Sequence, residues 1–313
     1  MLNFWGDDFS PDFTLQNRGG YIMRQSRCKR FRELLEKPGL LLRPCGYDAL
    51  SALLIEKAGF RLMGTSGYAI SASAIGQPDL GLISFGELLE RARNIINCVS
   101  IPVDVDADTG YGNALNAYWT AKNYIWIDAA GIRIEDQTWP KRCGHMSGKS
   151  IISKEEMAAK IRSAIRAREE EGSDLVIGAR TDARAIEGFE GTVERAILYA
   201  QAGADYVYVE CPQSLEEVAR LVKSISVPLA FNLIPGGKTP DFALSELEDL
   251  GVKYISIPMI CIYPAVRSMQ EALRALRKGD LKQVGELGIN WSDFNELIGV
   301  KKWRRLEEES AVR

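Results

Sequence analysis

Short apolar runs alternate with longer amphipathic stretches along the chain from about residue 40 onward. The longer stretches, such as 49–58 and 154–171, are rich in Ala, Leu, Glu, Lys and Arg and have helical spacing. This alternation is typical of parallel strands joined by helical crossovers. The predicted strands are 40–44, 61–65, 101–106, 131–135, 175–180, 206–210, 228–232 and 254–258.

Eight such βα units predict an α/β fold, a closed (β/α)₈ TIM barrel. The competing architecture is a doubly wound open sheet, which usually has fewer strands, and no GxGxxG follows the first predicted strand. With 313 residues, 46% of them hydrophobic, the chain is long enough for one such barrel. We expect a single domain over 26–313 with a helical extension from about residue 268. Residues 1–25 show neither period and are expected to form an N-terminal arm.

Composition and charge indicate which kinds of binding partner the protein is expected to have. The formal net charge is -3 and neither sign forms a long run, which disfavours a nucleic-acid partner. No stretch reaches the roughly 18 consecutive apolar residues of a membrane helix. The first eleven residues carry Asp7 and Asp8 and no basic residue, unlike a signal or transit peptide. We therefore expect a soluble, cytoplasmic protein that acts on a small molecule.

Polar residues follow seven of the eight predicted strands, at the end of a barrel where enzymes carry their chemistry. Carboxylates meeting there would shift each other's pKa by several units unless they shared a cation. A single Asp after a strand more often caps a helix, but Asp106, Asp108, Glu135 and Glu210 together predict a site for Mg²⁺, with Mn²⁺ as the alternative ion. The residues that follow the strands are Tyr47, Asp48, 65–68, Asp106, Asp108, Glu135, Asp136, 180–182, Glu210 and Asn232.

Arg180 ends the fifth predicted strand. Its guanidinium could hold a substrate carboxylate through two hydrogen bonds. The alternative is a structural ion pair with one of the neighbouring carboxylates, and the two roles are compatible.

The segment 139–149 after the fourth predicted strand is basic, contains two glycines and is long enough to form a lid over the strand ends. Within it Cys143 is flanked by Lys141, Arg142 and His145, the only histidine of the chain. Such an electropositive setting lowers a thiol pKa, so we expect a reactive thiol that exchanges a proton near neutral pH. The other five cysteines are scattered and are expected to be reduced core residues.

The sequence resembles the isocitrate lyase/phosphoenolpyruvate mutase superfamily from about residue 43 to 258. The motifs that carry the resemblance are GYDALSA, TSGYAISASAIGQPDLG, PVDVDADTGYGN, IEDQTWPKRCGHMSGK, ARTDA, YVEC and NLIPGGKTP. The resemblance implies a barrel whose last helix is exchanged between subunits of a homotetramer. It also implies an active-site Mg²⁺ and a mobile loop that carries the cysteine.

Carried over by position, the resemblance implies a role for each candidate site residue. Asp106 and Asp108 correspond to the metal-site aspartates, and Asp79 and Glu135 to residues that support the water shell of the metal. Tyr47 corresponds to a residue near the substrate oxygen. The positions that contact substrate are Ser66, Gly67, Tyr68, Arg180, Glu210 and Asn232, and the catalytic loop contributes Cys143, Gly144 and His145.

The KRCGH motif at 141–145 resembles the branch of lyases acting on isocitrate, 2-methylisocitrate and 2,3-dimethylmalate, and the oxaloacetate hydrolases. Carboxyphosphonoenolpyruvate mutases are also similar through this loop. Two positions depart from the family pattern. Tyr263 stands where methylisocitrate lyases carry an arginine for the extra carboxylate, which disfavours a tricarboxylate substrate. Arg133 replaces a histidine, and either tunes the metal or pairs with Asp128.

These observations predict a carbon–carbon lyase that binds a 2-hydroxy dicarboxylate through Mg²⁺ and Arg180 and breaks its C2–C3 bond. The products would be a 2-oxo acid and an enediolate, which Cys143 protonates as the general acid. Tyr47 or metal-bound water would remove the hydroxyl proton. Oxaloacetate hydrolysis and a phosphonomutase reaction remain open. A catalytically silent barrel that binds a dicarboxylate is the alternative from another class.

Overall fold

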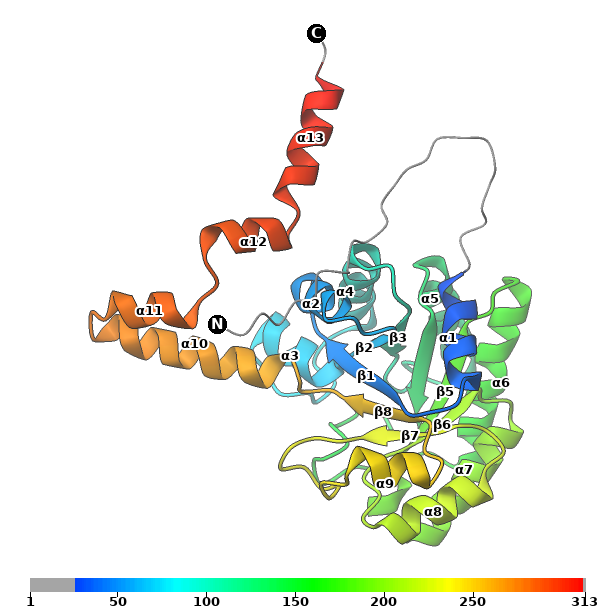
Figure 1. Ribbon diagram of the computed structural model, residues 1–313. Coiled ribbons are helices and arrows are strands. Elements are labelled where there is room, and N and C mark those ends of the chain that lie inside the picture. Colours follow the sequence, from blue (N-terminus) through cyan, green and yellow to red (C-terminus); the bar gives the residue numbers. More distant parts are fainter. Residues whose placement is uncertain (1–25, 312–313) are drawn as a thin grey trace.

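Eight parallel strands pair in chain order and close into a barrel, as the alternation of apolar and amphipathic segments predicts (Figure 1). The structure is a computed structural model that describes residues 26–311, so the predicted arm over 1–25 lies outside the described residues. The strands are β1 Leu41–Gly46, β2 Met63–Thr65, β3 Val103–Asp106, β4 Gly131–Glu135, β5 Val176–Thr181, β6 Tyr206–Val209, β7 Leu229–Asn232 and β8 Tyr254–Ile257.

Helices follow the strands and cover the barrel from outside (Figure 1). The helices around the barrel are α1 Arg27–Glu36, α2 Ala49–Lys57, α3 Gly67–Ile75, α4 Phe85–Cys98, α5 Ala114–Trp126, α6 Lys154–Glu170, the short 3₁₀ helix η1 Ala183–Ala185, α7 Gly188–Gln201, α8 Leu215–Ser224 and α9 Leu244–Asp249. The C-terminal helices are α10 Ile262–Arg277, α11 Leu281–Leu287, α12 Trp291–Leu297 and α13 Val300–Ser310.

Polar side chains mark where several helices begin. The Ser84 hydroxyl accepts from the Glu87 backbone N–H at 3.4 Å, and the Glu87 carboxylate accepts from the Ser84 N–H at 2.8 Å. At the start of α2, Asp48 Oδ1 accepts from the Ser51 N–H at 2.8 Å. These reciprocal bonds satisfy N–H groups that have no partner inside the helix. Asp48, one of the polar residues after the first strand, is therefore a helix cap.

The main apolar core lies between the strands and the surrounding helices. Alternate residues of each strand point outward into it, among them Val105, Ile132, Ile134 and Ile177, all of them buried. Strands covered in this way on both faces have few exposed positions, which is why they appear in the sequence as continuous apolar runs.

The N-terminal end of the barrel is filled by aromatic rings and one buried ion pair. Phe31 of α1 packs edge-on against Tyr254, with ring centroids 6.0 Å apart. Asp104 accepts hydrogen bonds from the hydroxyls of Tyr206 and Tyr254, and lies 3.1 Å from Arg43 Nη2. The Arg43 guanidinium occupies the space that a side chain at Gly64 would need. Access to the barrel interior is thus closed at this end.

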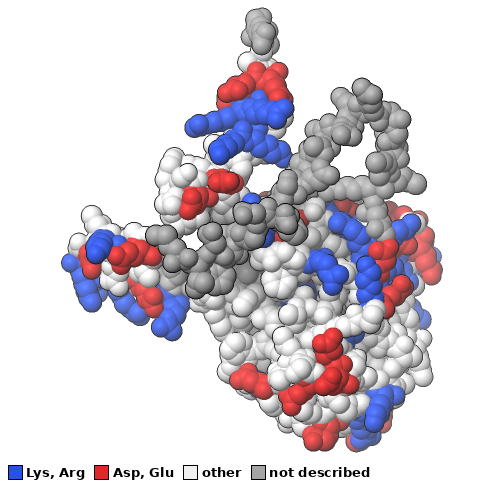
Figure 2. All heavy atoms as spheres, in the orientation of Figure 1, with Lys and Arg blue, Asp and Glu red and all other residues white. Residues whose placement is uncertain are grey.

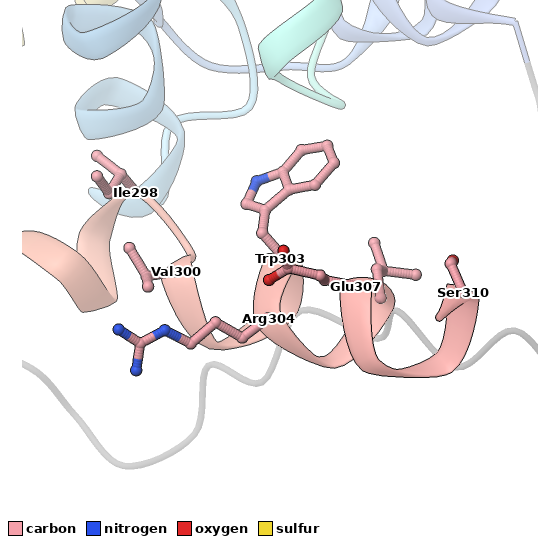
Figure 3. Close-up of a pocket in the computed structure, with 7 residues that line it drawn as sticks. Ile298, Val300, Trp303, Arg304, Glu307 and Ser310 are labelled. Carbon is pink, nitrogen blue, oxygen red and sulfur yellow. The ribbon is translucent and has the colours of Figure 1, made fainter. Parts of the chain in front are cut away.

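The C-terminal helices extend away from the barrel, with α10 and α11 on one side and α13 beyond them (Figure 1). On the face shown in Figure 2, acidic and basic side chains intermix, also along these helices. A hollow of about 600 Å³ lies beside α13. Figure 3 shows the residues that line it, Trp303 among them. Along the described part of the chain, no helix is long and apolar enough to cross a bilayer.

Candidate active site

The turn after β3 brings two aspartates to the open end of the barrel. The Asp106 N–H donates to Thr65 Oγ1 of β2 at 2.9 Å, and the Asp108 N–H donates to Asp106 Oδ1 at 3.3 Å. Asp108 has a φ of 46°, a left-handed conformation that Asp tolerates better than most residues. Its carbonyl accepts from the Glu135 N–H at 2.8 Å, which fixes this turn against the end of β4.

Asp79, Asp106 and Asp108 form one acidic site around the Lys141 ammonium. Lys141 Nζ lies 2.8 Å from Asp79 Oδ2 and 2.8 Å from Asp108 Oδ1. A side-chain carbon added at Gly67 would lie 3.4 Å from both Asp106 Oδ2 and Lys141 Nζ. The structure therefore brings three of the four predicted metal-site carboxylates to one place, and the backbone of Gly67 borders it.

Neighbouring charges move the pKa values of these aspartates in opposite directions. Burial opposes ionisation of Asp106, but the charges of Arg133 and Lys141 outweigh it and lower its pKa to about 2. Burial raises the pKa of Asp108 to about 6, with Asp106 and Asp79 adding to the effect and Lys141 opposing it. The carboxylates are thus close enough to disfavour one another's charge, as converging acids without sufficient counter-charge do.

Arg180 on β5 lies between Glu135 and Glu210, at the ends of β4 and β6. Its guanidinium lies 3.3 Å from Glu135 Oε2, 2.8 Å from Asp182 Oδ2 and 3.0 Å from Glu210 Oε2. The ion-pair alternative for Arg180 is therefore present, with three partners. Burial raises the pKa of Glu135 well above its usual value despite Arg180. Burial opposes ionisation of Glu210 too, but Arg180 outweighs it and lowers that pKa.

Asn232 and Glu210 meet at the ends of β7 and β6. Asn232 Nδ2 donates to the two Glu210 carboxylate oxygens at 3.2 and 3.3 Å, and Tyr208 donates to Asn232 Oδ1. Tyr208, which sequence reasoning missed, points into the barrel because it lies two residues before Glu210 on the same strand face. That spacing is the signal that could have identified it.

Arg133 on β4 lies between Asp106 of the acidic site and the Tyr208 ring. Its Nη2 is 3.3 Å from Asp106 Oδ2, and its guanidinium stacks 4.4 Å from the centre of the Tyr208 ring. Asp128, the other partner considered for it, pairs instead with Arg27 at 2.8 Å. Two further nitrogens of the buried Arg133 guanidinium have no hydrogen-bond partner among the described residues. The extra positive charge thus belongs to the acidic site.

The predicted lid folds over the strand ends and is fastened on both flanks. On one side Lys141 reaches the acidic site. On the other, Lys149 Nζ donates to Asp182 Oδ1 at 2.6 Å and to the Gly144 carbonyl at 2.5 Å. Between them the Cys143 N–H donates to the Asp79 carbonyl at 3.2 Å. Asp182, one of the polar residues predicted at the strand ends, and Lys149 of the lid are further residues of the site, for which the sequence predicted no specific role.

The expectation of a lowered thiol pKa at Cys143 is wrong. Burial raises the pKa of Cys143 to about 11; a backbone hydrogen bond at His145 opposes this, and Glu210 and Asp79 add to it. Lys141, the basic neighbour in the motif, directs its ammonium to the acidic site instead. Lys141 is close to Cys143 in sequence, but its ammonium is directed to the acidic site. Burial therefore dominates, and the thiol keeps its proton at neutral pH.

Ser66, Tyr47 and Tyr68 border the site from β1 and α3. Ser66 Oγ accepts from the Ala69 N–H at 3.3 Å and caps α3. Tyr47 and Tyr68 pack against an apolar cluster that includes Met259. Burial raises the pKa of Tyr47, and Asp48 adds to the effect. The assignment of Tyr47 as the base stays a prediction.

Tyr263, at the start of α10, lies near Tyr68. It lines a hollow of about 560 Å³ between α3 and α10 together with Tyr68. Burial raises its pKa, with Tyr68 and Cys143 as the neighbouring groups that contribute. The side chain at position 263 is therefore a phenol, and Arg267 and Arg274 of α10 line the same hollow.

The acidic site has the chemistry of a site for a hard divalent cation. Its side-chain donors are carboxylate oxygens, which Mg²⁺ prefers. One oxygen of the buried Glu135, Oε1, has no hydrogen-bond partner among the described residues. An unpaired buried carboxylate oxygen is costly unless a cation or ordered water faces it. The residues present therefore fit such an ion.

A second cluster of potential metal ligands consists of His145, Glu210 and Cys211. Two of its contacts make it poorly suited to a softer metal ion. Its ligand atoms lie within 4.8 Å of one another. His145 Nδ1, however, accepts the Lys238 N–H at 2.9 Å, which places the ring proton on Nε2, the atom facing Glu210. Arg180 also occupies the Glu210 carboxylate. We interpret this group as a polar contact of the lid.

Known proteins share this architecture. The family described as phosphoenolpyruvate phosphomutase matches this chain over residues 31–277. The chain is 39% identical to 2,3-dimethylmalate lyase of Eubacterium barkeri over 90% of this chain and 98% of that relative. It is 40% identical to the chloroplastic carboxyvinyl-carboxyphosphonate phosphorylmutase of Arabidopsis thaliana, over 95% of this chain and 89% of the relative.

Two solved structures are informative about ligands. One is an oxaloacetate acetylhydrolase in complex with the inhibitor 3,3-difluorooxalacetate, with a TM-score of 0.86 and 31% identity over 92% of this chain and 98% of that one. The other is a phosphonopyruvate hydrolase complex with oxalate and Mg²⁺, with a TM-score of 0.81 and 30% identity over 91% of this chain and 99% of that one.

Proposed function

Because the chain belongs to the phosphoenolpyruvate phosphomutase family, we propose that it is a Mg²⁺-dependent lyase that cleaves the C2–C3 bond of a small 2-hydroxy dicarboxylate. The observation that carries the proposal is the position of the lid. Gly144 lies against Arg180 and Glu210, while Lys141 of the same lid reaches the acidic site. The segment that carries the thiol thus covers the carboxylates and the guanidinium together.

Asp106 and Asp108 would hold the ion, with Asp79 and Glu135 supporting it. When bound, Mg²⁺ would supply positive charge that stabilises the oxyanion developing on the substrate. Support comes from the clustered carboxylates and from the phosphonopyruvate hydrolase, which was solved with Mg²⁺ and oxalate. Mn²⁺, which accepts the same oxygen ligands, is the alternative ion.

Arg180 would orient the substrate through a carboxylate. Its guanidinium is fixed by three acidic partners, so its position is set before substrate arrives. Ser66, Gly67 and Tyr68 would contact the substrate from β2 and α3, and Asn232 with Glu210 from the opposite side.

Cys143 would donate the proton that completes the reaction. Cleavage of C2–C3 leaves an electron pair on C3 as an enediolate, and protonation of that carbon gives the carboxylic acid product. A thiol with a pKa of about 11 is protonated at neutral pH and matches the role of donor. Tyr47 would accept the hydroxyl proton, with a group of the acidic site as the alternative acceptor that the raised pKa of Tyr47 favours.

We favour a dimethylmalate-like substrate over a tricarboxylate. The support is Tyr263 at the lid, where a guanidinium for an additional carboxylate would be expected, and the similarity to 2,3-dimethylmalate lyase over 98% of its length. Oxaloacetate hydrolysis is the second candidate, favoured by the TM-score of 0.86 to an oxaloacetate acetylhydrolase. A silent binding barrel is disfavoured, because no candidate metal carboxylate and neither Arg180 nor Cys143 has been lost.

We further propose a homotetramer in which α10 packs on a neighbouring subunit. Support comes from the apolar face of α10, where Met269 is 54% and Leu273 is 65% exposed, and from its course away from the barrel (Figure 1). A helix with such a face is normally covered by another surface. Light scattering at micromolar concentration would test it, and a monomer would contradict it.

A product assay tests the proposed reaction. Purified protein with Mg²⁺ is incubated with 2-methylmalate, 2,3-dimethylmalate, 2-methylisocitrate or oxaloacetate, and pyruvate and oxalate are measured. Pyruvate from 2,3-dimethylmalate, lost on chelation of the ion and restored by its addition, is the expected result. Oxalate from oxaloacetate alone would favour the hydrolase. No product from any of the four would refute both reactions.

A further inference from the structure

The loop between β7 and α9, residues 233–243, contacts the lid at His145. The Lys238 backbone N–H donates to His145 Nδ1 at 2.9 Å. The Lys238 ammonium donates to the Met146 carbonyl at 3.3 Å. Two elements about 90 residues apart in sequence are therefore joined at the apex of the lid.

Gly237 is a glycine because the His145 ring occupies the space of a side chain. A Cβ at this position would lie 2.7 Å from His145 Nδ1, 2.8 Å from its Cε1 and 2.9 Å from the Ile234 carbonyl oxygen. All three distances are well below van der Waals contact. The φ of Gly237 is not in the left-handed region. Space, and not backbone conformation, therefore requires glycine here.

The opposite edge of the ring faces the substrate-binding side. His145 Nε2 lies 3.0 Å from Glu210 Oε1, without the alignment of a hydrogen bond. Since Nδ1 is an acceptor, the ring proton lies on Nε2, the nitrogen nearer Glu210. Glu210 is in turn held by Arg180 and Asn232. The ring is thus clamped between the loop and the groups expected to bind substrate.

We propose that Gly237 and Lys238 form a latch that holds the lid closed by clamping the His145 ring against Glu210. Lys141 and Lys149 fasten the flanks of the lid, whereas the latch fastens its apex, next to Cys143. Gly237, Lys238 and His145 act in this as positioning residues, because they set where the thiol lies. The inference rests on the proposed function only in that the thiol is the group the lid delivers.

Alkylation of Cys143 measures lid opening without any substrate. The thiol is partly buried when the lid is closed, so iodoacetamide reacts faster when the lid opens more often. Peptide mass spectrometry follows Cys143, and Cys98 on α4, a partly buried thiol away from the lid, serves as an internal reference.

Gly237→Ala is expected to raise the alkylation rate of Cys143 by about tenfold, the scale of one hydrogen bond lost from the closed state. The Cys98 rate should not change. Gly285→Ala is the control, because Gly285 lies in α11 without a positive φ and a Cβ there would meet nothing within 4 Å. In a His145→Ala background the Gly237→Ala change should have a smaller effect, since the ring is gone and only the contact with the Ile234 carbonyl oxygen remains.

Three results would overturn the latch. They are an unchanged Cys143 rate in Gly237→Ala, equal increases in Gly237→Ala and Gly285→Ala, and full additivity of the Gly237→Ala and His145→Ala effects. Should Gly237→Ala fail to fold by circular dichroism, His145→Ala and Lys238→Ala decide the matter, and no faster alkylation in either refutes the proposal. Because the assay needs no turnover, a failed search for substrate leaves its outcome interpretable.

Discussion

Adding a single methyl group at Gly144 should impair catalysis while leaving the fold intact. A Cβ at residue 144 would lie 2.6 Å from Glu210 Cγ, and still closer to Glu210 Cδ and Arg180 Nη2. Ordinary carbon contacts begin near 3.5 Å, so the lid would have to retreat by about 1 Å. Arg180 and Glu210 cannot give way, because both are buried and paired at 3.0 Å, and Arg180 is also tied to Asp182.

Displacing a catalytic group by about 1 Å reduces turnover by about 100-fold, which corresponds to about 2.7 kcal/mol of transition-state stabilisation. We expect that loss in kcat for Gly144→Ala, measured as pyruvate release from the best substrate of the panel. Thermal stability should change by less than about 1 kcal/mol, since the lid can open without disturbing the barrel.

Gly86→Ala is the control, because a Cβ on that helical glycine would meet nothing within 4 Å and should leave kcat unchanged. A Gly144→Ala variant that is folded and keeps kcat within about twofold of the parent would refute the reasoning. The lid conformation described above would then not be the one in which the reaction occurs.

Further changes probe other parts of the site. Cys143→Ala should lower turnover by about 100-fold or more while leaving Mg²⁺ binding, measured by calorimetry, intact; unchanged turnover would remove the thiol from the mechanism. Because burial raises the pKa of Cys143 to about 11, the thiolate is scarce at neutral pH, so its alkylation rate should keep rising up to about pH 11; a plateau near pH 9 would contradict this. Arg133→His should tighten Mg²⁺ binding by about tenfold in calorimetry at pH 8, because it removes a fixed positive charge 3.3 Å from Asp106; weaker binding would show that Arg133 supports the ion. Asp104→Asn should destabilise the fold by about 3–5 kcal/mol in urea titrations, because Arg43 would remain buried without its counter-ion; a loss below about 1 kcal/mol would contradict a structural role for the pair.

The barrel could be predicted from sequence because its signal is local and repeated. The observed β4, Gly131–Glu135, has the predicted bounds, and the other strands overlap their predicted ranges. Each strand is buried on both faces, so its apolar run stands out between amphipathic helices. The carboxyl ends of parallel strands meet at one rim of the barrel. The sequence alone could therefore predict that Asp106, Glu135 and Arg180 lie close together.

What sequence reasoning missed depends on contacts between distant segments. Lys141 was expected to act on Cys143 two residues away, but its ammonium lies between Asp79 and Asp108. The thiol pKa then follows burial, which no motif encodes. The contact of His145 with Lys238 joins two loops whose relation only the closed barrel establishes.

The plug formed by Phe31, Arg43 and Asp104 gives the molecule two ends with different tolerances. Structural integrity resides at the sealed base, whereas the residues that would select a substrate stand on loops at the rim. Substitutions at rim positions such as Tyr47 can therefore alter the site at little risk to the scaffold. Such a division of labour explains how one ancestral frame could diversify into lyases, hydrolases and mutases.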